Sequence, residues 1–246
     1  MSMSPQLRGD QDALALAKSV TGGWTFGNGI AERFEGHIRQ SVPMYDEGHA
    51  VVQRLSRFFC KPGGTFYELG VATGKLLDEL ATHTADLDGV SWVGIDNEPE
   101  MVAYASNACA KHKNVQVILG DITRVGLKPT NFIVSYYTLQ FLPLGQREDV
   151  LRKAYEALSP GGAFVLFEKI RTATAQVQEI ANLLYWEFKK HQGLSAPEIL
   201  DKAYSLIGVM DPATSAENVA MCRRVGFTQV EPVVRYVCFE GLLAIK

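Results

Sequence analysis

A strand that leads into a glycine-containing turn and then directly into a helix constrains the fold of this chain most. Residues 65–69 form a short run of strand-forming residues, Gly70 and Gly74 follow them, and a helical pattern begins directly afterwards. A second apolar run, 91–95, ends at Asp96. Glycines between a strand and a helix let the backbone approach a ligand, and an acid at the end of the next strand can bind ribose hydroxyls. This stretch therefore predicts a nucleoside site at the edge of an α/β sheet.

The same turn restricts the kind of nucleoside. A dinucleotide site requires more glycines than Gly70 and Gly74, because the backbone has to surround a pyrophosphate. An adenosine ligand without phosphates, such as S-adenosylmethionine (SAM), does not require them. The carboxylate of Glu68 at the turn also suits a ligand with an ammonium group. We therefore predict SAM as the cofactor.

Strand and helix patterns alternate through most of the chain. We expect strands at 65–69, 91–95, 115–119, 131–136, 163–167, 229–234 and 236–245, and helices at 46–59, 74–84, 98–112, 146–158 and 215–225. Such alternation is typical of a sheet with helices on both faces. The predicted fold class is α/β, a doubly wound Rossmann-like sheet of seven strands with the last pair antiparallel. Ligands of such sheets bind beyond the carboxyl ends of the strands, where Glu68, Asp96, Asp121 and Tyr136 fall.

The domain organisation follows from this pattern. Residues 1–22 are predicted to be a flexible N-terminus, with a short helix at 10–19. Residues 23–246 are predicted to form a single domain. Within it, residues 41–45 predict an extended turn, because Pro43 disfavours helix just before it.

An insertion interrupts the alternation late in the chain. Residues 172–212 carry two helical patterns, 176–191 and 196–208, between two strand regions. An insertion at the ligand edge of a sheet suits a helical lid.

Composition and charge exclude several classes of function. The net charge is −3, and basic pairs such as Lys189-Lys190 are too short to form a face for nucleic acid, so we expect them on an exposed helix surface. No apolar run approaches the length of a membrane span. The four cysteines and five histidines form no metal-ligand spacing, so no metal is predicted. Without a signal peptide, the chain is predicted to be cytoplasmic.

Further motifs resemble those of class I SAM-dependent methyltransferases. They are Glu68-Leu-Gly70 with Gly74, Asp96, Gly120-Asp121 and Leu158-x-Pro-Gly-Gly162, with Ala72 in place of the usual middle glycine. A closer resemblance, from Trp24 to Lys246, is to the carboxy-SAM synthase family. It is carried by His37-Ile-Arg-Gln-Ser-Val-Pro-Met-Tyr45, Ile95-Asp-Asn97, Gly120-Asp-Ile122, Thr138-Leu-Gln-Phe-Leu142 and Glu168-Lys169. That family makes carboxy-SAM from SAM and prephenate, and the resemblance implies a homodimer.

Two positions depart from the pattern of that family. The arginine that binds the added carboxylate in the synthases is Ala203 here, directly after Lys202, and a family asparagine is Tyr136. A carboxylate in a partly dry pocket needs a charge-assisted partner, and an arginine supplies two parallel hydrogen bonds. Lys202 offers only a point charge. These departures argue against carboxy-SAM as product or ligand.

The residues and the resemblance together predict the SAM site. Its cofactor-binding residues are Tyr45, Glu68, Gly70, Ala72, Gly74, Asp96, Asn97, Asp121, Ile122 and Tyr136. Glu68 and Gly70 are assigned to the methionine end, Asp96 to the ribose, and Asp121 with Ile122 to the adenine. Simpler roles stay open, because Asp96 also suits a helix cap, and Glu68 and Asp121 also suit loop acids.

Aromatic side chains are predicted to surround the sulfonium, whose charge an aromatic face stabilises. The predicted catalytic residues are Tyr45, Tyr136 and Tyr204. Because strand side chains alternate, one of Tyr136 and Tyr137 should face the pocket and the other the core, and the resemblance selects Tyr136. The aromatics of the insertion, Tyr185, Trp186, Phe188 and Tyr204, equally suit simple packing.

The leading functional prediction is methyl transfer from SAM to a small-molecule acceptor in secondary metabolism. SAM alkylation is a displacement with a neutral leaving group, so it needs alignment and exclusion of water rather than a catalytic triad. One alternative is cyclisation of SAM to azetidine-2-carboxylate with release of methylthioadenosine, which requires a neutral SAM amine. Further alternatives are carboxy-SAM synthesis at a rebuilt site and SAM binding without catalysis.

Overall fold

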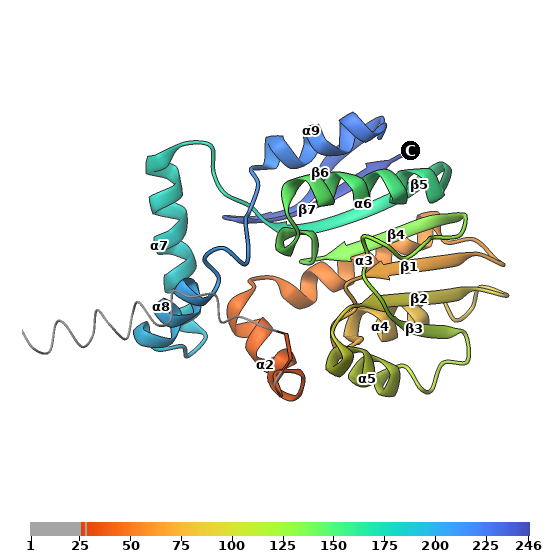
Figure 1. Ribbon diagram of the computed structural model, residues 1–246, viewed down its shortest axis with the longest axis horizontal. Helices are drawn as coiled ribbons and strands as arrows, with labels where there is room; N and C mark the ends of the chain where they lie inside the picture. Colours follow the sequence, from red (N-terminus) through yellow and green to blue (C-terminus); the bar gives the residue numbers. More distant parts are fainter. Residues whose placement is uncertain (1–25, 28) are drawn as a thin grey trace, which may run out of the picture.

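A mixed sheet forms the centre of the molecule (Figure 1). The computed structural model describes residues 26–27 and 29–246. Its strands are β1 (Thr65–Leu69), β2 (Ser91–Asp96), β3 (Val115–Leu119), β4 (Thr130–Tyr136), β5 (Leu158–Lys169), β6 (Gln229–Tyr236) and β7 (Phe239–Ile245). Within this part of the chain, the strand order of the seven-stranded sheet is β3-β2-β1-β4-β5-β7-β6. The first five strands pair in parallel, and β7 pairs antiparallel with β5 and β6, which confirms the predicted fold class.

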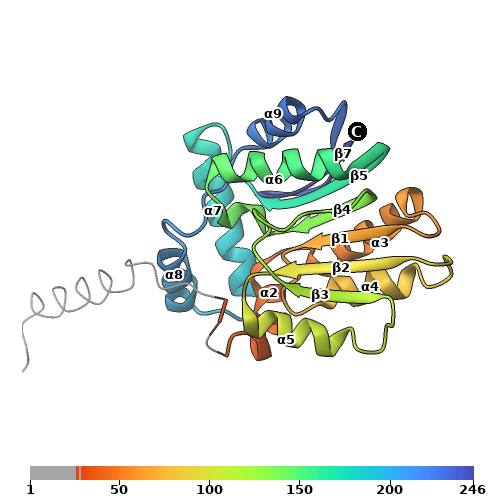
Figure 2. The same cartoon turned by 45° about the vertical axis from the view of Figure 1, so that its right-hand side comes forward.

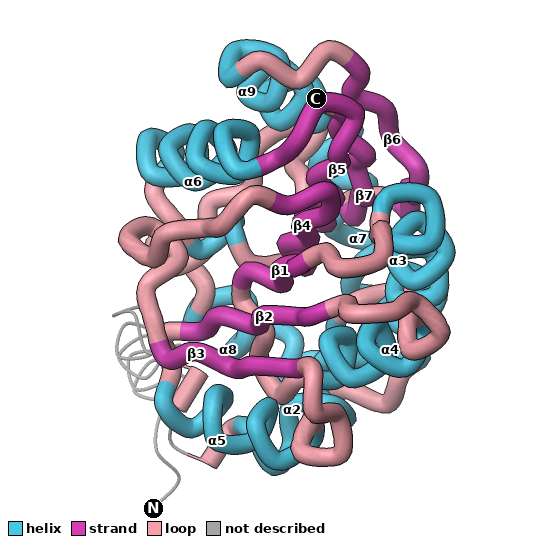
Figure 3. The backbone as a smooth tube through the Cα atoms, turned by 90° about the vertical axis from the view of Figure 1, so that its right-hand side faces the viewer, coloured by secondary structure: helices cyan, strands magenta, loops and turns pink. Residues whose placement is uncertain are grey.

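Helices cover both faces of the sheet (Figure 3). They are α2 (Ala31–Ser41), α3 (Tyr45–Phe59), α4 (Lys75–His83), α5 (Pro99–Ala108), α6 (Leu144–Ala157), α7 (Ala175–His191), α8 (Ala196–Ser205) and α9 (Ser215–Val225), with a 3-10 turn η1 (Leu139–Phe141). The helices α3, α4 and α5 pack on one face, and α6 and α9 pack on the other. The central strands are therefore apolar on both sides, as buried parallel strands require.

Two hydrophobic clusters fill the spaces between the sheet and these layers. Trp92 is fully buried in the first, against Phe66 and Phe132, and its indole nitrogen donates a hydrogen bond of 2.9 Å to the Thr84 hydroxyl. The second cluster contains Phe164 and lies beneath α6 and α9. Because both faces are closed by packing, the open edge at the carboxyl ends of the strands is left for a ligand.

The two helices of the insertion lie beyond that edge. Figures 1 and 2 both show α7 and α8 on the side to which the parallel strands point. A capping box begins α8, in which Ser195 and Glu198 each accept a hydrogen bond from the other's backbone N–H. We call α7 and α8 the lid, and that they cover a bound ligand stays a prediction.

One expectation before the sheet is wrong in detail. Residues 41–45 do not form an extended turn, because α2 continues to Ser41 and α3 already begins at Tyr45. The chain passes from α2 to α3 within three residues, and Met44, the last of them, takes a left-handed conformation with φ of 56°. Tyr45 therefore lies in the first turn of a helix. The helix expected at 10–19 lies outside the described residues.

A further difference concerns the start of β5. The strand begins at Leu158 and not at residue 163 as expected, and so includes the Pro160-Gly-Gly162 segment. The N–H of Gly161 donates to the carbonyl of Lys246, which ties this segment to the C-terminal strand. Across the described part of the chain, every helix is too short or too polar to cross a membrane.

Candidate functional site

A cavity of about 270 Å³ lies at the carboxyl ends of the central strands. The loops after β1, β2, β3 and β4 supply one wall, and α2, α3 and the lid supply the other. Of the predicted cofactor-binding residues, Tyr45, Glu68, Gly70, Ala72, Asp96, Asn97, Asp121, Ile122 and Tyr136 line it. The structure thus brings together side chains from four separate strand ends.

The loop after β1 is held in a conformation that needs its glycines. Gly70 has a φ of 81°, and a Cβ atom there would overlap the Thr138 side chain. Ala72, at the position of the usual middle glycine, also takes a left-handed conformation, with φ of 45°. Gly74 does not line the cavity; its added Cβ would lie 2.7 Å from Cα of Ala105, so it permits close packing on α5.

Asp96 organises this loop. Its carboxylate accepts hydrogen bonds from the N–H of Ala72 (2.9 Å) and from the N–H of Glu98 (3.0 Å). Burial raises the pKa of Asp96 although these N–H donors oppose the shift. The carboxylate therefore has a structural role beside the start of α5. Because it also lines the cavity, its predicted contact with the ribose stays open.

Glu68 lies at the centre of the wall and is 3% exposed. One carboxyl oxygen, Oε2, has no hydrogen-bond partner. Burial, followed by the negative charge of Asp96, raises the pKa of Glu68 well above its ordinary value. A buried polar atom without a partner at a cavity wall fits a ligand that supplies a hydrogen bond there.

Asp121 and Ile122 follow β3 at the far end of the cavity. One oxygen of Asp121 accepts hydrogen bonds from the N–H (2.8 Å) and the hydroxyl (2.7 Å) of Thr123, which lower the pKa of Asp121. Ile122 is buried beside it. An ionised acceptor next to an apolar side chain matches an adenine, which offers an amine and a flat apolar face.

Tyrosines form the part of the cavity near β4 and the lid. The hydroxyl of Tyr136 donates to the carbonyl of Tyr45 (2.7 Å), and the two rings lie edge to face with centroids 5.4 Å apart. Tyr137 also lines the cavity, contrary to the expected alternation. The strand ends at Tyr136 and Tyr137 has a φ of 58°, so the backbone turns and brings both rings to one side.

Of the four aromatic residues named for the insertion, Tyr185 alone lines the cavity. Tyr185, Lys202 and Leu206 line the cavity, but Tyr204 does not. Lys202 of α8 and its C-cap residue Leu206 are four positions apart and lie on the same side, whereas Tyr204 projects in another direction. Its predicted catalytic role has no geometric support.

The prediction that both lysines at the end of α7 are exposed was also wrong for one of them. Lys189 was expected on an exposed helix surface, but only 3% of it is exposed, whereas Lys190 is exposed as expected. His37 of α2, which was assigned no role, lines the cavity with Lys169 and Lys202. The period of a helix reveals which residues share a side, but a helix of mixed polarity does not reveal which side faces a cavity.

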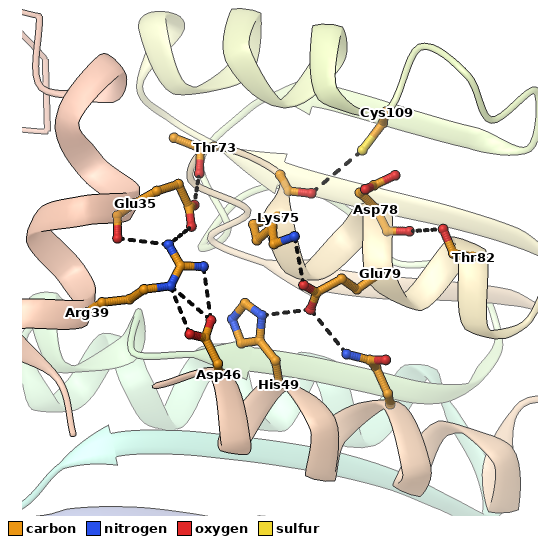
Figure 4. A network of polar contacts seen from close by, with 12 residues as sticks. Glu35, Arg39, Asp46, His49, Thr73, Lys75, Asp78, Glu79, Thr82 and Cys109 are labelled. Carbon is orange, nitrogen blue, oxygen red and sulfur yellow. Dashed lines mark hydrogen bonds and ion pairs between the residues drawn. The ribbon is translucent and has the colours of Figure 1, made fainter. Parts of the chain in front are cut away.

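A polar network ties α2 and α3 to the loop after β1 (Figure 4). The Thr73 hydroxyl donates to Glu35 (2.5 Å), and Arg39 pairs with Glu35 (3.0 Å) and with Asp46 (2.8 Å). These contacts hold α2 against the glycine loop, so α2 forms a fixed wall of the cavity. Among residues 26–27 and 29–246, His, Cys, Asp and Glu side chains form no group of three that could hold a metal ion.

Comparison with known proteins identifies the class of fold to which this chain belongs. A family model described as a methyltransferase domain matches residues 66–162. Among solved structures, a putative O-methyltransferase from Nostoc punctiforme is similar, with a TM-score of 0.59 and 16% identity, over 82% of this chain and 56% of that one. A cyclopropane synthase from Mycobacterium tuberculosis has a TM-score of 0.55 and 16% identity, over 75% and 62%. The chain therefore has the fold of the methyltransferases.

Its sequence relatives define the family more narrowly. A carboxy-S-adenosyl-L-methionine synthase from Staphylococcus epidermidis is 33% identical over 224 residues, which cover 91% of this chain and 97% of the relative. A synthase of the same name from a Nitratiruptor species is 33% identical, covering 94% and 96%. The chain belongs to the carboxy-SAM synthase family.

Proposed function

We propose that this protein acts on SAM alone and cyclises its methionine chain to azetidine-2-carboxylate, releasing methylthioadenosine. The observation that supports this most directly is the size and lining of the cavity. Its volume of about 270 Å³ is just below the range of about 300–1,000 Å³ that is typical of ligand pockets. A cavity of this volume suits an adenosine-sized ligand.

The lining residues suit SAM from one end to the other. Asp121 and Ile122 would receive the adenine and Asp96 the ribose, while the unpartnered oxygen of Glu68 lies toward the methionine end. Beyond Glu68 the walls are aromatic, with Tyr45, Tyr136, Tyr137, Tyr185 and Phe239. Aromatic faces stabilise a sulfonium by about 2 kcal/mol when it is removed from water.

The proposed reaction balances without a further reactant. The lone pair of the neutral α-amine attacks the γ-carbon, the bond between the γ-carbon and sulfur breaks, and its electron pair stays on sulfur. The positive charge moves from sulfur to the ring nitrogen, and neutral methylthioadenosine leaves. The protein has to fold the methionine chain and exclude water, which is the contribution expected of a tight aromatic pocket.

The neutral amine that this reaction needs is compatible with Glu68. An ionised carboxylate would hold the amine as ammonium, and ammonium is not a nucleophile. Burial and Asp96 raise the pKa of Glu68, which favours its uncharged form before a ligand binds. If Glu68 stays uncharged when SAM binds, it does not stabilise ammonium over free amine and does not oppose cyclisation.

Carboxy-SAM synthesis is a second candidate, and the names and identities of the sequence relatives favour it. The position of the family arginine is Ala203, directly after the cavity-lining Lys202. A single lysine replaces the two parallel hydrogen bonds of an arginine only in part. Methyl transfer, the leading prediction from sequence, stays a prediction and requires an acceptor to enter beside the sulfonium.

One assay separates these reactions. Purified protein is incubated with SAM alone, with SAM and prephenate, and with SAM and a cell extract, and products are identified by mass spectrometry. Cyclisation predicts equal amounts of methylthioadenosine and azetidine-2-carboxylate from SAM alone. If carboxy-SAM forms, and only when prephenate is present, the second candidate is established. If S-adenosylhomocysteine forms, and only when extract is present, methyl transfer is established. Either result rejects cyclisation.

We also propose that the protein forms a homodimer through α7. Its outer side carries the exposed apolar residues Val177, Ile180, Leu183 and Leu184, each at least 47% exposed. An apolar stripe of this kind on a helix is typical of an interface. The family resemblance implies the same assembly.

A further inference from the structure

A buried arginine connects two separate walls of the cavity. Arg147, in α6, is only 2% exposed, and among the described residues its guanidinium donates hydrogen bonds to three backbone carbonyls. Those of Leu142 (2.7 Å) and Gln140 (3.1 Å) belong to the turn after β4 that contains η1. The third, that of Asp211 (2.6 Å), belongs to the chain that returns from the lid to the sheet. One side chain therefore joins two segments that are distant in the sequence.

Both segments supply residues that face the cavity. Gln140, Phe141 and Leu142 line it from the turn. On the lid side, Met210 lines it directly before Asp211. The N–H of Asp211 also donates to the carbonyl of Gln140 (3.1 Å), so the two segments are hydrogen-bonded to each other as well. The arginine itself does not line the cavity, so it acts on these lining residues from behind.

Gln140 extends the connection to the end of β5. Its side-chain oxygen accepts a hydrogen bond from the N–H of Lys169 (2.8 Å), and its side-chain nitrogen donates to the carbonyl of Tyr137 (3.2 Å). Tyr137 and Lys169 both line the cavity. Because Arg147 holds the carbonyl of Gln140, the turn, the end of β5 and the returning end of the lid form one hydrogen-bonded unit.

The chemistry of these contacts explains why the position suits an arginine. A guanidinium carries five N–H donors in a fixed planar arrangement, so it can reach carbonyls that lie in different directions. Burial raises the pKa of the neighbouring Glu168 to about 8, and the charge of Arg147 opposes that rise. A buried charge is costly when its donors lose their acceptors. The guanidinium therefore favours the arrangement in which both segments are in place.

We propose that Arg147 is a positioning residue of the SAM site, which couples the turn after β4 to the returning end of the lid. A ligand that contacts either segment then stabilises both, because the same guanidinium holds them. The proposal rests on the proposed placement of SAM in this cavity, but not on which reaction follows. It also gives a role to Gln140, within the motif Thr138-Leu-Gln-Phe-Leu142, that requires no chemistry of its own.

Binding measurements test the positioning role. Isothermal titration calorimetry gives the affinity for S-adenosylhomocysteine of the full-length wild type, of Arg147→Met and Arg147→Lys, and of the control Arg152→Met. Arg152 is exposed on the same helix and pairs with Glu148 (3.2 Å). We expect Arg147→Met to weaken binding about tenfold or more and Arg152→Met to change it less than about twofold. Arg147→Lys should recover part of the loss, because it keeps the charge but places its donors at one point.

Hydrogen exchange supplies a readout that a purely structural role would not move. In the wild type, S-adenosylhomocysteine should slow exchange of the backbone amides in both segments, 138–142 and 206–213. In Arg147→Met, at saturating ligand and well below its Tm, the ligand should still slow exchange in the first segment but no longer in the second. The control Arg152→Met should behave as the wild type.

Three results would overturn the proposal. A lowered Tm with an affinity within about twofold of wild type would give Arg147 a role in stability alone. Equal protection of both segments by the ligand in Arg147→Met would show that other contacts couple them. A ligand that protects neither segment of the wild type would place SAM outside this cavity. If Arg147→Met does not fold, Arg147→Lys decides by the same two measurements. Because S-adenosylhomocysteine does not react, a failure of cyclisation would leave these results unchanged.

Discussion

Replacing Asp96 by asparagine separates the two roles that the structure allows for this residue. The carboxylate accepts the N–H groups of Ala72 and Glu98 at 2.9 Å and 3.0 Å. Asparagine has nearly the same shape but offers one acceptor and one donor, so one N–H group loses its acceptor. The loss of one hydrogen bond to a charged, buried group costs about 2 kcal/mol of stability. For a chain of this size, that lowers Tm by about 4–8 °C.

The ligand-binding role predicts a second, independent loss. If the Asp96 carboxylate also accepts the ribose hydroxyls, Asp96→Asn should weaken S-adenosylhomocysteine binding about 10- to 100-fold, because a charged hydrogen bond contributes about 1.5–3 kcal/mol. Calorimetry measures the affinity and differential scanning fluorimetry measures Tm of the unliganded protein. Asp88→Asn, at an exposed loop position outside the cavity, serves as the matched control and should change neither.

The two readouts together decide the interpretation. A lowered Tm with an affinity within about twofold of wild type would show that Asp96 holds only the loop after β1. The nucleoside would then lie elsewhere, and the placement of SAM along the cavity would be refuted.

Three further predictions concern the cavity wall, Lys202 and the interface. Tyr136→Phe removes the hydroxyl that donates to the carbonyl of Tyr45, and should lower Tm by about 2–4 °C. We also expect SAM turnover to fall more than nucleoside affinity. Equal losses of turnover and affinity would give Tyr136 no role near the sulfonium. The pKa of Lys202 is lowered to about 6 in the folded state, so between about pH 6 and 10 the unfolded chain binds a proton that the folded chain does not, and stability rises with pH. Lys202→Met should remove part of that rise in Tm, and parallel pH profiles would contradict the lowered pKa. Leu184→Glu should convert a dimer to a monomer in sedimentation analysis, and an unchanged sedimentation coefficient would argue against the α7 interface.

The strand-turn-helix unit was predictable because its signals are local. Gly70 is required where φ is 81°, and strand β2 ends at the acid that the loop needs, so residues close in sequence determine this wall of the cavity. The boundaries of β1, β3 and α9 match the expected ranges for the same reason. Periodicity and turn chemistry were sufficient there.

The lid side of the cavity could not be predicted in this way. Lys189 and Lys190 are adjacent and chemically identical, yet one is buried and the other exposed, because only the packing of α7 on the ends of β5 and β7 selects the inward side. The turn at Tyr137 breaks the alternation of β4 through a positive φ that no glycine signals. Tyr137 lines the cavity and Tyr204 does not, and neither position was predictable, because each depends on contacts between elements distant in the sequence.

The central claim is that the γ-carbon of SAM changes its bond from sulfur to the nitrogen of the same molecule. SAM labelled with ¹³C in the methionine chain, mixed with the purified protein and no other substrate, allows NMR to follow that carbon directly. We predict that its resonance moves from the sulfonium position to that of a ring carbon bonded to nitrogen, as methylthioadenosine accumulates in equal amount. A γ-carbon that stays bonded to sulfur, in any product that forms, would contradict the proposed cyclisation.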